Sequence, residues 1–173
     1  MEGESVLQML AEVSVAFAGF TGVVAALGSR SIGGWRPVDV IRFRTMVTFS
    51  LFTLGFALLP ILLHHLGLAP RTYWAASSAV LALVLPLWLI RARRLHLKYR
   101  VHQDPDFVPG FSRAVQALMV PTLVVLVLNA VDVGLHRSFG GYLIGLCFLL
   151  FICCGMFVLL LRFVRFQDAD IGT

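Results

Sequence analysis

Four of the polar side chains within the apolar stretches of this sequence are the first candidates for ion chemistry. Gln8 and Glu12 lie in the first apolar stretch, and Asn129 and Asp132 lie in the fourth. A charged side chain in the middle of a bilayer costs about 3 kcal/mol, so such residues usually face protein or water and often mark routes for ions or protons. We therefore predict that these four residues bind ions or line an ion pathway.

Histidines form a second set of possible ligands. If the apolar stretches cross a membrane in alternating directions, His64, His65 and His136 lie in the same outer layer as Glu12 and Asp132. Imidazole and carboxylate together can bind a transition metal or relay protons, and two histidines on different helices can hold haem. The histidines also suit a membrane–water interface without any ligand, so a haem- or metal-binding redox protein is the alternative function.

Small residues recur at four-residue steps along the first apolar stretch. The row consists of Ser14, Ala18, Gly22 and Ala26. Small side chains let two helix backbones approach closely, which is how helices associate when lipid offers no hydrophobic driving force. We predict that this row packs against helices of the same chain, meets its copies in an oligomer, or lines a central pathway.

Two arginines stand where the second apolar stretch begins. Arg42 and Arg44 would form an inner basic ring in an oligomer, and such a ring concentrates anions. Their alternative role is to set the orientation of the helix in the membrane, as basic residues beside membrane spans ordinarily do.

The elements that must position these residues are five long apolar segments. The chain has 173 residues, of which 59% are hydrophobic and 13% charged, and this composition does not suit a soluble domain. A hydrocarbon core about 30 Å thick needs roughly 20 helical residues, and helices satisfy their own backbone hydrogen bonds in lipid. We predict one all-α transmembrane domain over residues 1–173. Its helices span about 6–28, 38–68, 73–100, 113–136 and 140–165, with a cytoplasmic loop at about 101–112.

Basic residues predict the orientation. Of the 14 Lys and Arg residues, only Arg71 and Arg137 fall on one side of the membrane, which leaves twelve on the other. Cytoplasmic loops retain basic residues, so the N-terminus is predicted outside and the C-terminus in the cytoplasm. The multi-pass protein would lie in the plasma membrane of a bacterium or archaeon. Its net charge of +5 suits anionic lipid headgroups beside the cytoplasmic loops, not nucleic acid.

Motifs for catalysis are missing from the sequence, which has no Gly-rich phosphate loop, nucleophile elbow or two-histidine zinc helix. We therefore expect no enzyme and, in the preferred interpretation, no cofactor. That interpretation is a homo-oligomeric channel or transporter-like protein that conducts or binds small cations through its outer acidic residues. Besides the haem or metal alternative, a non-catalytic subunit that helps to assemble another membrane complex is a further alternative.

Overall fold

Five helices make up the part of the chain that the computed structural model describes, residues 3–28, 37–98, 107–134 and 137–170. They are α1 (Glu4–Gly28), α2 (Pro37–His65), α3 (Pro70–Lys98), α4 (Pro109–Val131) and α5 (Phe139–Asp170). Each contains a segment of at least 20 residues that is long and apolar enough to cross a membrane. The prediction of an all-helical protein with five candidate membrane spans is confirmed, whereas the orientation of its ends stays a prediction.

Proline and left-handed backbone positions account for several helix ends. Helices α2, α3 and α4 each begin at a proline, whose missing N–H and fixed φ suit the first helical turn. Gly67, in the link after α2, has a φ of +83°, a conformation that glycine adopts without strain. At the end of α4, Asp132 has a φ of 67°, and its N–H donates to the carbonyl oxygen of Leu128. This left-handed residue ends the helix because the next backbone groups turn away from the helix axis.

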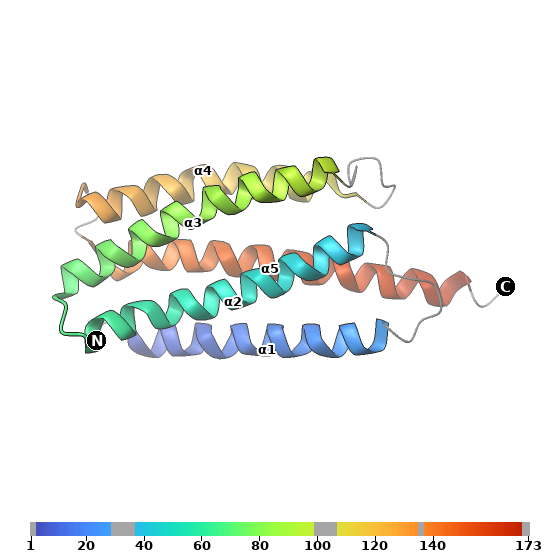
Figure 1. Ribbon diagram of the computed structural model, residues 1–173, viewed down its shortest axis with the longest axis horizontal. Helices are drawn as coiled ribbons and strands as arrows, with labels where there is room; N and C mark the ends of the chain where they lie inside the picture. Colours follow the sequence, from blue (N-terminus) through green and yellow to red (C-terminus); the bar gives the residue numbers. More distant parts are fainter. Residues whose placement is uncertain (1–2, 29–36, 99–106, 135–136, 171–173) are drawn as a thin grey trace.

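The helices form an elongated bundle in which α5 lies between two helix pairs (Figure 1). Helix α1 packs chiefly against α2, and α3 packs chiefly against α4, while α5 contacts α2, α3 and α4. Aromatic contacts also join α1 to α5, since the ring of Phe157 lies 5.0 Å from that of Phe20. Helix α1 is therefore at the edge of the bundle, and one of its sides has no neighbouring helix in the protomer.

Glycines bring α5 close to its neighbours. A Cβ atom on Gly145 would lie 2.6 Å from a methyl carbon of Leu81 and 2.9 Å from one of Leu126. Both leucines are completely buried. The hydroxyl of Tyr142 donates to the carbonyl oxygen of Phe56 at 2.5 Å, which ties α5 to α2. The centre of the bundle is therefore closely packed, as helix interfaces with small residues are in membranes.

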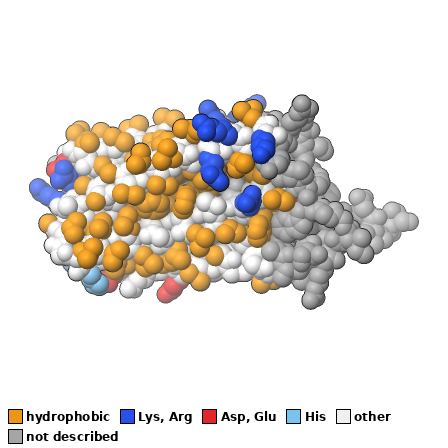
Figure 2. Space-filling view, viewed as in Figure 1, with side chains coloured by type: hydrophobic (Ala, Val, Ile, Leu, Met, Phe, Trp, Pro, Cys, Tyr) orange, Lys and Arg blue, Asp and Glu red, His pale blue; other side chains and the backbone are white. Residues whose placement is uncertain are grey.

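Charged side chains divide unevenly between the two ends of the bundle. Arg71 and Arg137 lie at the end where α1 begins, beside the α2–α3 and α4–α5 links. At the opposite end, the described Lys and Arg residues of α2, α3 and α4 are Arg42, Arg44, Arg91, Arg93, Arg94, Lys98 and Arg113. Figure 2 shows hydrophobic side chains along the length of the bundle and most basic side chains of the visible face toward one end. This uneven distribution is the one that membrane proteins use to set their orientation.

Candidate functional site

The side of α1 that faces away from the bundle carries a regular row of exposed residues, here called the α1 seam. Its members follow one another at alternating steps of three and four residues, and they are Ser5, Gln8, Glu12, Val15, Gly19 and Gly22. This spacing keeps all six on one face of a helix, as in the contact seam of a coiled coil. Five of the six are small or polar, which is unusual for a helix face that would otherwise meet lipid.

Buried hydroxyls of α1 are on the opposite side and are satisfied by their own helix. Ser14 is 1% exposed and donates to the carbonyl oxygen of Leu10 at 2.6 Å. Thr21 is also buried and donates to the carbonyl oxygen of Phe17 at 2.5 Å. These groups require no partner from outside the protomer, unlike the polar groups of the α1 seam.

Glu12 is the charged member of the α1 seam. It lies within Glu4–Val23, the apolar part of α1, and its side chain is exposed in the protomer. Gln8, one helical turn earlier on the same face, is exposed as well. Glu12 is about 9 Å along the helix from Val6, where the apolar stretch begins, at a rise of 1.5 Å per residue. At that depth a carboxylate facing lipid would be costly, so this face favours contact with protein or water.

Gly19 and Gly22 of the α1 seam have open space beside them. A Cβ atom on either residue would meet nothing within 4 Å. In α5, by contrast, the glycines at 141 and 145 are required because a Cβ atom would approach neighbouring side chains within 3 Å. Contacts inside the protomer therefore account for the glycines at 141 and 145 but leave those of the α1 seam without a packing role.

The predicted row of small residues winds across two surfaces of α1. Ser14 is buried against the bundle, Ala18 is half-buried and Gly22 is exposed on the α1 seam. The side chain of Ala26 lies outside the described part of the structure. A four-residue step advances by about 40° around a helix, so such a row turns from one neighbour toward another. Steps of four and seven residues also place Gln8, Glu12 and Gly19 on one side of a helix, and this spacing is visible in the sequence alone.

Asn129 lies at the junction of three elements. It is completely buried, and its Nδ2 donates to Ser78 Oγ at 2.8 Å and to the carbonyl oxygen of Ser138 at 3.1 Å. The N–H of Ser138 in turn donates to Asn129 Oδ1 at 2.8 Å. The side chain thus joins α4 to α3 and to the link before α5, which gives it a clear structural role.

We expect Asn129→Leu to lower the free energy of unfolding by about 2 kcal/mol. The replacement keeps the number and branching of side-chain heavy atoms but leaves the hydroxyl of Ser78 and the backbone groups of Ser138 without their partner. Unfolding by sodium dodecyl sulfate in mixed micelles, followed by circular dichroism, measures the change. Asp132→Asn is the control and should alter stability by less than about 1 kcal/mol, because it removes only an exposed ion pair. Equal stabilities for the two variants would contradict this role of Asn129.

Asp132, His64 and His65 lie at the end of the bundle where α1 begins. The carboxylate of Asp132 is one-third exposed and lies 3.8 Å from the Nε of Arg137. His64 and His65 are exposed at the end of α2, and their ring centroids are 5.7 Å apart. His136 falls outside the described residues. Among the side chains that the structure describes, no group of three or more His, Cys, Asp or Glu residues is arranged to hold a metal ion.

The predicted outer residues lie on different sides of the bundle. Glu12 and Gln8 belong to α1, whereas Asn129 and Asp132 belong to the end of α4, and α2 and α5 lie between these two helices (Figure 1). Asn129 is occupied by contacts inside the protomer, and Asp132 lies beside Arg137. Within one protomer the structure therefore joins only Gln8 and Glu12 into a common polar surface.

The two arginines at the beginning of α2 have different surroundings. Arg42 is 6% exposed, and its Nη1 lies 3.1 Å from the Oδ1 of Asp39, one turn earlier on α2. Arg44 is exposed. A buried pair of opposite charges costs free energy to desolvate, so Arg42 and Asp39 depend on each other. The spacing of three residues between them was visible in the sequence and could have predicted the pair.

Comparisons of the chain with protein-family models, curated proteins and solved structures find no match. No activity, partner or ligand is therefore carried over to this chain from another protein. A functional proposal therefore rests on the side chains described above, among which the α1 seam is an exposed polar surface on a candidate membrane span.

Proposed function

We propose that the protein is a homo-oligomeric channel or transporter-like protein for small cations, in which α1 seams of neighbouring copies face one another. The observation that carries this proposal is the exposed position of Glu12 on a membrane-spanning helix at the edge of the bundle. Neighbouring copies would remove this carboxylate from lipid and so avoid the cost of a charge in the hydrocarbon layer.

The composition of the α1 seam suits such a contact. Gly19 and Gly22 leave space for another helix to approach closely, as small residues do at helix interfaces in membranes. Gln8 and Glu12 would then lie next to their counterparts in other copies. Carboxylates that converge repel one another unless a cation or a shared proton lies between them. A shared polar zone of this kind attracts cations, which is why we favour cations as the conducted or bound species.

The proposed orientation follows from the basic residues. The end of the bundle that carries Arg42, Arg93 and their neighbours would lie at the cytoplasmic side of the plasma membrane, next to anionic lipids. Helix α1 would then begin outside and place Glu12 in the outer half of the bilayer. Cations would reach Gln8 and Glu12 from the outer surface.

Cation flux into liposomes tests this function. Purified protein should increase the uptake of K⁺ or Na⁺ by vesicles, and Glu12→Gln should lower that uptake about fivefold, since it removes one favourable charge from each copy. Asp132→Asn is the matched control, because it neutralises an acidic residue on a different helix, and its flux should equal that of the wild type. Vesicles that take up no cation with the wild-type protein, or equal flux for the two variants, would contradict the proposal.

A further inference from the structure

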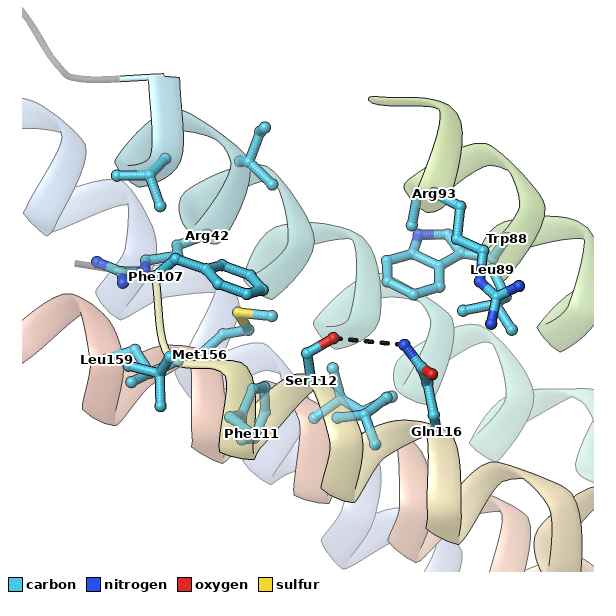
Figure 3. Close-up of a pocket in the computed structure, with 16 residues that line it drawn as sticks. Arg42, Trp88, Leu89, Arg93, Phe107, Phe111, Ser112, Gln116, Met156 and Leu159 are labelled. Carbon is cyan, nitrogen blue, oxygen red and sulfur yellow. Dashed lines mark hydrogen bonds between the residues drawn. The ribbon is translucent and has the colours of Figure 1, made fainter. Parts of the chain in front are cut away.

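A crevice at the basic end of the bundle lies among α2, α3, α4 and α5 (Figure 3). Its volume is about 90 Å³, and most of its wall is apolar, including Ile41, Trp88, Leu89, Phe111, Val115 and Met156. Trp88 and Leu89 belong to Pro70–Leu95, the part of α3 that is apolar enough to cross a membrane. The crevice is therefore at the depth of the lipid chains, close to the level of their headgroups.

Polar groups are present at both ends of the crevice. Arg93 of α3 and Gln116 of α4 are the exposed members of its lining and lie together at one end in Figure 3. Gln116 donates its Nε2 hydrogen to Ser112 Oγ at 3.4 Å, and Arg93 has no acidic partner among the residues whose side chains are described. At the other end, Arg42 lies beside Phe107 and is paired with Asp39.

This distribution of charge and apolar surface selects the kind of ligand. A water molecule is stably held only where it has two to four polar partners, and a space with apolar walls does not supply them. A free anion could bind to Arg93 and Gln116 but would make no contact with the apolar wall. A molecule with an anionic head and an apolar chain matches both parts, and the membrane around the crevice supplies such molecules.

We propose that the crevice binds an anionic phospholipid of the adjacent leaflet, with its phosphate at Arg93 and Gln116 and part of one acyl chain between α3 and α4. The guanidinium of Arg93 and the amide of Gln116 donate hydrogen bonds to phosphate oxygens. The volume is smaller than the roughly 150 Å³ of a cavity that holds benzene, so it receives a segment of one chain and not a whole lipid tail.

Native mass spectrometry of the full-length protein in detergent tests this site with phosphatidylglycerol and phosphatidylcholine as probes. We expect phosphatidylglycerol to bind more tightly, and Arg93→Gln to weaken its binding about fivefold, the effect of one basic residue at an anionic surface. Arg94→Gln is the matched control, because Arg94 is exposed on the same helix but does not line the crevice. Equal losses for the two arginine variants would overturn the headgroup position.

A second pair of variants tests the acyl chain. Ala92→Phe fills the crevice and should abolish the tightest lipid-binding event, whereas Ala117→Phe, on the exposed side of α4 outside the lining, should leave it intact. Unchanged lipid binding by Ala92→Phe would overturn the proposal. So would binding of glycerol 3-phosphate as tight as that of the lipid, which would indicate a site for a free anion. Loss of oligomers with Ala92→Phe, without loss of lipid, would instead assign the crevice to a second copy and also overturn it.

Discussion

Gly19→Leu is expected to convert the proposed oligomer into monomers that keep the helical fold. Gly19 lies in the middle of the α1 seam, and the space beside it is open in the protomer. A leucine there holds two α1 helices apart wherever the seams of two copies meet, and close backbone approach is the main source of attraction between such helices. We expect the dissociation constant to rise at least a hundredfold. Size-exclusion chromatography with light scattering in detergent measures it, and circular dichroism checks the fold.

Gly55→Leu is the matched control for this prediction. Gly55 is exposed on α2, and a Cβ atom there would meet nothing within 4 Å, so the same substitution adds the same side chain in equally open space. Because Gly55 lies outside the α1 seam, its variant should remain as oligomeric as the wild type. If both variants stayed oligomeric, or both became monomers, the seam would not be the contact between copies.

Gly145→Leu is expected to have a different result, a less stable fold. Its Cβ atom alone would lie within 3 Å of Leu81 and Leu126, which are completely buried in the centre of the bundle. The three further carbons of leucine have no space there unless α5 moves away from α3 and α4. Overpacking of a well-packed core costs up to about 3 kcal/mol and occasionally more, and we expect a loss at the upper end of this range.

Thermal unfolding in detergent measures this loss of stability. The variant should give little monodisperse protein and a clearly lower melting temperature, while Gly55→Leu should unfold at the temperature of the wild type. A normal melting temperature for Gly145→Leu would show that α5 is less closely packed than the structure indicates. Together, the three glycine variants separate a glycine that permits folding from one that permits association.

The five helices could be predicted from the sequence because the membrane leaves few alternatives. A backbone in hydrocarbon must satisfy its own hydrogen bonds, so each long apolar run is expected to be helical. Pro37 marks the start of α2 in the sequence, and the structure begins the helix there. Pro70 and Pro109 also begin helices, three and four residues before the starts predicted at about 73 and 113. The uneven distribution of basic residues could also be predicted from the sequence, because it depends on where Lys and Arg occur along the chain and not on packing.

The surfaces of these helices could not be predicted in the same way. In a soluble protein a polar side faces water, but in a membrane lipid and protein interior are both apolar, so hydrophobicity does not separate them. Leu7 and Leu10 are buried, whereas Met9 and Val13 are exposed, although all four are large and apolar. Which side of α1 meets α2 therefore depends on complementary shape, which becomes visible only when the neighbouring helix is in place.

Contacts between residues that are far apart in the chain could likewise not be predicted from the sequence. Asn129 is bonded to Ser78, which is 51 residues away on α3, and nothing in the spacing of these residues indicates the contact. The crevice is similar, because Arg93 and Gln116 become neighbours only when α3 and α4 pack together. The sequence identified Asn129 and Glu12 as unusual polar residues in apolar surroundings, but only the fold distinguishes a side chain occupied inside the protomer from one that faces outward.

Disulfide cross-linking between copies tests the central claim, that α1 seams face one another, most directly. In a protein that keeps the buried Cys153 but has alanine in place of the exposed Cys147 and Cys154, one new cysteine would be placed either at Val15, on the seam, or at Val13, roughly 160° around the same helix. Both valines are exposed in the protomer. Oxidation in native membranes should link copies through Val15→Cys but not through Val13→Cys. Dimers formed equally at both positions, only at residue 13, or at neither would contradict the account.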